Sequence, residues 1–188
     1  MRVIGGEFRS RRLKSVPGLD TRPTPDRLRE TLFDILMDRI EGCVFVDAYA
    51  GTGAVGIEAL SRGARRVVFL ERSRHAAGVI RENLRSLGAG EDRAVVVVGK
   101  AAALLRRFEA DIVFLDPPYD SAQEYDAAFE ALAGACCRLV IAQHSTRLAL
   151  KDRYGRLSRY RTVRQGDNSL SFYAEAEADA RQADAPTS

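Results

Sequence analysis

The residues best suited to chemistry form one four-residue stretch, Asp116-Pro117-Pro118-Tyr119. It follows an apolar run at residues 112–115, which predicts a buried parallel strand. Because prolines lack an N–H, the turn cannot extend the sheet, and its carbonyls remain available as acceptors. The Asp116 carboxylate is a further acceptor and the Tyr119 ring a flat face. An exocyclic nucleobase amine offers two N–H donors beside a planar ring, so this turn predicts a site for such an amine.

The same turn is also consistent with an ordinary strand terminator. Prolines end strands without any catalytic role, and a tyrosine is common at such an edge. A short motif needs its structural context before it indicates a function. The surrounding residues therefore decide between the two interpretations.

A glycine loop lies earlier in the chain, after a second apolar run that ends at Asp47. Gly51, Gly53 and Gly56 have the spacing of the dinucleotide fingerprint, and Glu71 lies twenty residues after Gly51. An NAD-type oxidoreductase is therefore one interpretation. However, Asp47 would place negative charge near a pyrophosphate, and the loop before Gly51 is long. Adenosylmethionine carries a sulfonium and an ammonium but no phosphate, so it fits an acid at this place better. Glu71 can accept ribose hydroxyls from either cofactor.

The elements that position these residues alternate along the chain. We expect strands at 43–46, 66–70, 95–98, 111–115 and 138–142, with helices at 55–62, 75–87, 101–108 and 122–134 between them, and two final strands at 157–163 and 169–173. Strands that alternate with helices indicate βαβ units. The expected fold class is α/β, a doubly wound, mostly parallel seven-stranded sheet with helices on both faces. Asp47, Glu71 and Asp116 each stand at the end of an expected strand.

The two ends of the chain differ from this pattern. Short runs broken by Gly-Gly and Pro-Gly pairs predict a basic hairpin or arm over residues 1–23. Thr24 is then expected to cap a helix that has Pro25 in its first position and ends at Gly42. The catalytic domain is expected over 24–173. The acidic segment 174–188 is expected to be a disordered tail.

Composition and charge limit the class of protein. The chain has 188 residues, 46% of them hydrophobic and 29% charged, as in ordinary soluble globular proteins. The net charge is only +3, but residues 9–14 hold four basic side chains and no acid, and residues 147–164 hold seven against one. Such clusters suit a polyanion such as nucleic acid, although a solvated charged surface is the alternative.

The remaining composition favours a cytoplasmic protein without a metal centre. No apolar run has the length of a membrane span, and the amino terminus lacks the apolar core of a signal peptide. Cys43, Cys136 and Cys137 have no metal-site spacing, and only two histidines are present. We therefore expect reduced, buried thiols and no metal ligands.

These motifs together resemble the class I adenosylmethionine-dependent amino-methyltransferases, which have a Rossmann-like fold. The resemblance rests on Asp47, residues 50–53 (Ala-Gly-Thr-Gly), Glu71 and the turn at 116–119. The amino-terminal part is similar to the RsmD family, the bacterial small-subunit ribosomal RNA guanine-N2 methyltransferases. That similarity is carried by residues 1–6, 22–24, 26–27, 29–33, 57–64 and 81–84, and it covers the chain from residue 1 to about 173.

The resemblance implies a role for each matching residue. Asp116 and the Pro117 carbonyl would hold the guanine amine, Pro118 would complete the catalytic turn, and Tyr119 would stack on the base. Thr24 and Arg29 would close over the methionine end of the cofactor, and Glu71 would bind its ribose. The other implied cofactor-binding residues are Asp47, Ala50, Gly51, Thr52 and Gly53, and the implied RNA-binding residues are Arg9, Arg11, Arg12 and Arg22.

The implied function is methyl transfer from S-adenosyl-L-methionine to the N2 amine of a guanine in 16S rRNA, either naked or within a small ribosomal subunit. Three alternatives remain open at the level of sequence. The catalytic turn is shared with amino-methyltransferases that act on adenine N6 or cytosine N4 of DNA or other RNA. A non-enzymatic RNA-binding module and a nicotinamide oxidoreductase are the other two.

Overall fold

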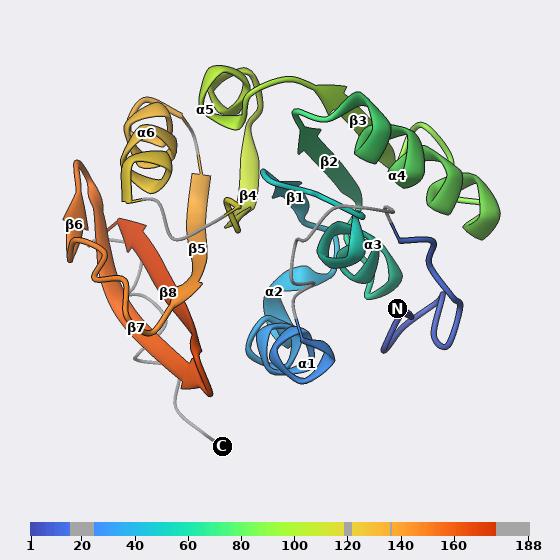
Figure 1. Ribbon diagram of the computed structural model, residues 1–188, viewed down its shortest axis with the longest axis horizontal. Helices are drawn as coiled ribbons and strands as arrows, with labels where there is room; N and C mark the ends of the chain where they lie inside the picture. The colour runs from blue at the N-terminus through green and yellow to red at the C-terminus, as the bar shows by residue number, and fades with distance from the viewer. Residues whose placement is uncertain (16–24, 119–121, 136, 176–188) are drawn as a thin grey trace.

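A single mixed sheet forms the centre of the molecule, which we describe from a computed structural model over residues 1–15, 25–118, 122–135 and 137–175 (Figure 1). The sheet has eight strands in the order β3-β2-β1-β4-β5-β8-β7-β6. The parallel part contains β1 (Val44–Asp47), β2 (Arg66–Glu71), β3 (Ala94–Val98), β4 (Ala110–Leu115) and β5 (Cys137–Ser145). The antiparallel part adds β6 (Arg153–Tyr154), β7 (Leu157–Gln165) and β8 (Asn168–Glu175).

The predicted doubly wound, mostly parallel sheet is confirmed, but the predicted number of seven strands is wrong. The additional strand, β6, is two residues long and pairs only with β7. A pattern of alternating side chains cannot be recognised over two residues, so the sequence gives no signal for it. The other strands begin and end within three residues of their expected bounds.

Six helices connect or flank the strands in the described residues. They are α1 (Asp26–Ile35), α2 (Met37–Ile40), α3 (Ala54–Ser61), α4 (Arg74–Leu87), α5 (Ala101–Leu104) and α6 (Ala122–Leu132). Two expected helices are divided. The one expected to end at Gly42 breaks at Leu36, and the one expected over 101–108 continues past α5 only as a 3₁₀ turn, Leu105–Arg107. The expected cap residue Thr24 lies outside the described residues.

Alternating strand residues supply two cores on opposite faces of the sheet. Phe45 and Phe114 pack with α1, α3 and α4, whereas Val46 and Leu115 pack with α5 and α6. Figure 1 shows α5 and α6 on one side of the sheet and α1 and α3 on the other. Both faces are therefore covered, as parallel sheets require.

The amino-terminal residues 1–15 fold back as a small hairpin. Arg2 and Arg12 form an antiparallel bridge, and the Val3 N–H donates to the Arg11 carbonyl at 3.0 Å. Val3, Phe8 and Leu13 are buried in the core that contains α1 and α3. The hairpin is thus packed onto the body of the protein.

The direction of winding reverses between β1 and β4. Strands β2 and β3 follow on one side of β1, and β4 and β5 lie on the other. In α/β sheets, ligands bind at the carboxyl ends of the strands where this reversal occurs. Asp47, at the end of β1, pairs in register with Phe114 of β4, and Leu115 pairs with Ala142 of β5. The ends of β1, β4 and β5 are therefore neighbours.

Candidate functional site

Asp47 is fixed beneath the glycine loop at the end of β1. Its side chain is buried, and its Oδ2 accepts the Gly56 N–H in the first turn of α3 at 2.9 Å. A Cβ on Gly56 would lie 2.3 Å from the Phe69 ring of β2, so only glycine lets the helix approach the strand this closely. Gly53 precedes the helix with φ of 80°, a left-handed conformation that glycine adopts at little cost.

The environment of Asp47 favours a cationic ligand. The pKa of Asp47 is raised to about 7, mainly by burial; the hydrogen bond from the Gly56 N–H lowers it, and the nearby Glu71 carboxylate raises it. A buried carboxylate without a positive partner is costly, and a cation close by would stabilise its ionised form. The sulfonium and ammonium of adenosylmethionine are charges of this sign.

Glu71, at the end of β2, holds the other side of the loop. One carboxylate oxygen accepts the Gly51 N–H at 2.9 Å, and the other accepts the Ser73 N–H at 2.7 Å. The Ala50 N–H donates to the Leu70 carbonyl at 3.0 Å. Each carboxylate oxygen has a second lone pair, so Glu71 can still accept ribose hydroxyls while it orders the loop.

Asp116 directly follows β4 and is half-buried, with Pro117 buried and Pro118 half-buried behind it. The Ala48 N–H donates to the Phe114 carbonyl at 3.0 Å, which joins the end of β1 to the end of β4. The structure therefore brings the glycine loop and the Asp-Pro-Pro turn to adjacent strand ends. Tyr119 lies outside the described residues.

Arg29 has partners that differ from those its predicted role requires. Its side chain is fully buried, and its Nη2 donates to the Arg2 carbonyl at 2.7 Å and to Asp26 at 3.0 Å. Its Nε lies 3.9 Å from Glu58 of α3. These contacts tie α1 to the amino-terminal hairpin and to α3. The predicted contact between Arg29 and the methionine end of a cofactor stays a prediction, as does that of Thr24, outside the described residues.

Asn83, for which the sequence predicts no individual role, joins the glycine loop to the amino-terminal hairpin. It is buried in α4, and its Nδ2 donates to the Thr52 carbonyl at 3.2 Å and to the Lys14 carbonyl at 3.1 Å. Its Oδ1 accepts the Lys14 N–H at 2.8 Å. An amide on the apolar face of α4, between Ile80 and Leu87, was the available signal, because a buried polar group needs hydrogen-bond partners.

The predicted RNA-binding arginines of the hairpin are exposed. Arg9, Arg11 and Arg12 all face solvent, and the Arg11 Nη2 donates to the Ser86 carbonyl at 2.6 Å. Arg22 lies outside the described residues. A second group of arginines, at the carboxyl end of β5 and on β7, surrounds a cavity of about 550 Å³.

Neither a metal cluster nor a membrane span is found in the part of the chain that the structure describes. No group of three His, Cys, Asp or Glu side chains there could hold a metal ion, and no helix there is long and apolar enough to cross a bilayer. Cys43 and Cys137 are buried, and burial raises the pKa of the Cys43 thiol to about 12. Cys136 lies outside the described residues.

Known proteins resemble this chain over most of its length. The ribosomal RNA small subunit methyltransferase D of Haemophilus influenzae is 36% identical over 140 residues, which cover 72% of this chain and 70% of that protein. A protein of Bacillus subtilis named putative rRNA methyltransferase YlbH is 30% identical over 92% of this chain and 98% of its own length. The solved structure of the Escherichia coli putative methyltransferase yhhF has a TM-score of 0.82 and 32% identity over 93% of this chain and 97% of its own.

These similarities confirm the predicted fold class, that of the class I adenosylmethionine-dependent methyltransferases. The model of the family described as conserved hypothetical protein 95 matches residues 1–174, nearly the entire chain. The family predicted from the sequence is confirmed as well: the chain belongs to the conserved hypothetical protein 95 family, that of the ribosomal RNA small subunit methyltransferase D enzymes.

Proposed function

We propose that this chain transfers a methyl group from S-adenosyl-L-methionine to the exocyclic N2 amine of a guanine in 16S rRNA. One observation carries the proposal. The glycine loop held by Asp47 and Glu71 lies at the end of β1, and the Asp116-Pro117 turn lies at the end of the adjacent strand β4. A methyl donor and an amine acceptor bound at these two places would be neighbours.

The residues present fit the cofactor by their chemistry. Asp47 is a buried acid with no cation among its described contacts, and Glu71 presents acceptor oxygens at the end of the next strand. Adenosylmethionine supplies an electrophilic methyl group on a positively charged sulfur. Asp47, Gly51 and Gly53 would form the floor of its site, and Glu71 would accept the ribose hydroxyls.

The Asp116 turn would prepare the amine for attack. In free guanine the amine lone pair is delocalised into the ring. Hydrogen bonds from the two amine protons to the Asp116 carboxylate and the Pro117 carbonyl would hold the nitrogen with its lone pair directed at the methyl group. The Asp116 carboxylate would stabilise the positive charge that develops on the nitrogen as the methyl carbon exchanges its bond to sulfur for a bond to nitrogen, and the methylated amine would then release one proton to solvent. Positioning supplies the rest of the rate enhancement.

The target base has to leave its stack to reach this turn. Enzymes that modify a base in structured nucleic acid extrude it or act on a loop. Tyr119 is proposed to stack on the extruded guanine and so to replace part of the lost stacking. The exposed arginines Arg9, Arg11 and Arg12 are proposed to hold phosphates of the same RNA. With this substrate, we propose that the enzyme acts in the cytoplasm.

Transfer of a labelled methyl group tests the proposal. Purified protein is incubated with labelled adenosylmethionine and either naked 16S rRNA or small ribosomal subunits, and the labelled nucleoside is identified after digestion. We expect N2-methylguanosine, and comparison of the two substrates shows which one the enzyme uses. Label on adenine or cytosine would instead indicate one of the related amino-methyltransferase activities. No transfer to either substrate would contradict the proposed function.

A further inference from the structure

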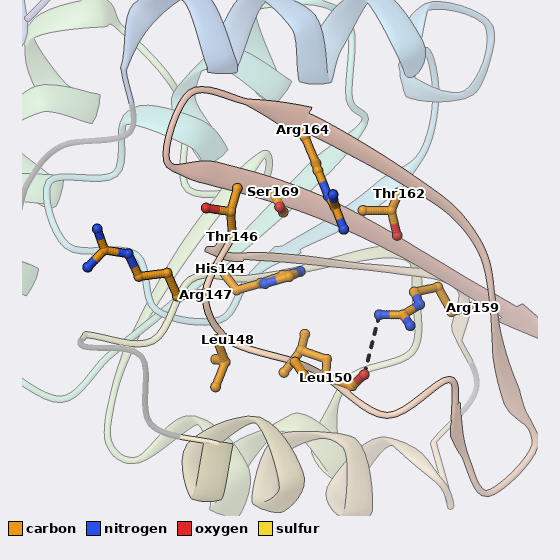
Figure 2. Close-up of a pocket in the computed structure, with 10 residues that line it drawn as sticks. His144, Thr146, Arg147, Leu148, Leu150, Arg159, Thr162, Arg164 and Ser169 are labelled. Atoms are coloured by element: carbon orange, nitrogen blue, oxygen red, sulfur yellow. Dashed lines mark hydrogen bonds between the residues drawn. The ribbon is translucent and has the colours of Figure 1, made fainter.

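The cavity at the carboxyl end of β5 lies on the face of the sheet that carries α6, next to the strands β7 and β8 (Figure 2). Its volume is about 550 Å³, within the range of sites that hold ligands of nucleotide size. Figure 2 shows that its side chains come from three segments of the chain, with Arg159 and Arg164 pointing toward His144 and Arg147 pointing away from them. The lining includes arginines, hydroxyls and, on one side, two leucines: Arg147, Arg159, Arg164, Thr146, Thr162, Ser169, Leu148 and Leu150.

A β-bulge in β7 brings three of these side chains to the same face. Thr162 pairs with Ser171 and Arg164 with Ser169, so both point to the side of the sheet that His144 occupies. The register shifts between Arg159 and Arg161. In a regular strand, Arg159 and Arg164 would point to opposite faces, because they are an odd number of residues apart. The extra residue reverses that alternation, so Arg159 lines the cavity. Arg161 instead lies over the Phe172 ring on the other face of the sheet.

Two of the three arginines at this cavity have no acidic partner among the described residues. Arg159 forms an ion pair with Asp152 and donates to the Leu150 carbonyl at 3.3 Å. Arg147 and Arg164 are exposed, and among the described residues no acid forms an ion pair with either. Two guanidinium groups without an acidic partner, Arg164 pointing toward His144 and Arg147 at the rim of the cavity, favour an anion, and guanidinium geometry matches phosphate.

The floor of the cavity is built from fixed polar groups. His144 Nε2 lies 2.9 Å from the Ser171 Oγ, and His144 Nδ1 lies 2.8 Å from the Ser145 carbonyl oxygen. Because only a protonated nitrogen can bond a carbonyl oxygen, Nδ1 donates to Ser145. The imidazole is therefore held in one orientation beneath the arginines.

The cavity lies close to the Asp116 turn. Leu115 pairs with Ala142, so His144 extends two residues beyond that pair, at the level of Pro117. Neighbouring strands are about 4.8 Å apart, so the cavity starts one strand away from the catalytic turn. An RNA strand whose guanine is held at Asp116 would carry its neighbouring nucleotide toward Arg147 and Arg164.

We propose that this cavity binds the phosphate of a nucleotide adjacent to the methylated guanine, with Arg164 on that phosphate, Arg147 at the rim on the backbone of the same strand, and Leu148 and Leu150 against the nucleoside. The proposal rests on the proposed function, because it assumes that RNA occupies the Asp116 turn. The basic cluster at residues 147–164 would then contribute to RNA binding together with the hairpin arginines.

Salt-dependent binding tests the assignment without any turnover. The double variant Arg147→Gln/Arg164→Gln removes two exposed charges, and Arg138→Gln is the matched control, since Arg138 is 86% exposed at the opposite end of β5. Binding of labelled naked 16S rRNA is measured by anisotropy between 50 and 300 mM salt, roughly the range over which phosphate contacts show their effect. We expect the double variant to bind about tenfold more weakly at 0.1 M salt, with a slope of log K against log salt smaller by about 1.5. The control should change the slope by less than about 0.3.

The outcomes separate this assignment from the proposed function. A double variant with the affinity and slope of the control would overturn the pocket assignment, whether or not the wild-type protein methylates the RNA. A reduced slope together with an absence of methyl transfer would support the pocket and contradict the proposed guanine methylation. Failure of the wild-type protein to bind the RNA would overturn both. Adenosylmethionine affinity of the double variant should equal that of the wild type, because its side chains lie away from the glycine loop.

Discussion

Asp116 is proposed to act in methyl transfer but not in cofactor binding. Its carboxylate is proposed to hold the substrate amine, whereas the proposed cofactor floor consists of residues of β1 and the loop after it. We therefore expect Asp116→Ala to reduce methyl transfer by at least about 10³-fold, because it removes the group that stabilises the developing charge. The dissociation constant for adenosylmethionine, measured by calorimetry, should change by less than about threefold. Turnover within tenfold of the wild-type rate would rule out the proposed role.

Asp47 should make the stability of the protein fall as the pH rises. The pKa of its carboxyl is about 7 in the folded protein against 3.8 for a freely solvated aspartate, mainly because it is buried. Between these two values the folded state holds a proton that the unfolded state has released, so the free energy of unfolding decreases from about pH 4 to pH 7 and then levels. The full effect is on the order of 4 kcal/mol.

The variant Asp47→Asn keeps an oxygen for the Gly56 N–H but cannot ionise. Urea unfolding at pH 5 and pH 8 should therefore show the variant gaining stability relative to the wild type by a few kcal/mol at the higher pH. Parallel pH profiles for the two proteins would show that Asp47 does not titrate in this range.

At the scale of single elements, Gly6 determines how closely the amino-terminal hairpin packs on α3. Gly6 has φ of +72°, and a Cβ there would lie 1.8 Å from the Ser61 carbonyl oxygen. The adjacent Glu7 N–H donates to that same oxygen at 2.7 Å. The contact leaves no space for a side chain, so Gly6→Ala should displace the hairpin from α3.

Gly42 provides the matched control for this substitution. It has φ of +73°, nearly the same as Gly6, but a Cβ there would meet no atom within 4 Å. Gly42→Ala should cost only the left-handed backbone penalty of about 1–2 kcal/mol, whereas Gly6→Ala should cost at least about 2 kcal/mol more. Urea unfolding measures both values. Equal losses in the free energy of unfolding would mean that the hairpin moves away from α3 without an energetic cost.

The sequence predicted the parallel elements well because each has a local signal. An apolar run followed by an acid or by prolines identified β1 and β4, and alternation of strands with helices gave the topology of the sheet. The burial of the hairpin could not be predicted, because its partners Glu58 and Ser61 lie more than fifty residues away in the chain. The bulge in β7 that directs Arg159 toward the cavity could not be predicted either, because it depends on the pairing of β7 with β8 and has no local sequence pattern.

The positions of the three acids in the candidate site could also be predicted from local sequence. Asp47, Glu71 and Asp116 were located at strand ends from local residues, and the structure places all three at the carboxyl edge of the sheet. The role of Asn83 was not predicted, because its partners, the Thr52 and Lys14 carbonyls, belong to segments that are distant in the sequence.

At the scale of the whole molecule, a cofactor that binds the folded chain must stabilise it. At a concentration of 100 times its dissociation constant, a ligand adds about 2.7 kcal/mol, which corresponds to roughly 5–10 °C in melting temperature for a protein of this size. We expect adenosylmethionine to raise the melting temperature by this amount and NAD at the same concentration to have no effect. A larger shift with NAD would favour the oxidoreductase interpretation of the glycine loop.

The hydrogen bonds of Asn83 make the glycine loop and the amino-terminal hairpin one coupled unit. One amide joins Thr52 in the loop to Lys14 in the hairpin, so a cofactor that shifted the Thr52 carbonyl would act on the segment that carries Arg11 and Arg12. Coupling between two binding sites is reciprocal. By whatever factor bound adenosylmethionine changes the affinity for RNA, bound RNA must change the affinity for adenosylmethionine by the same factor.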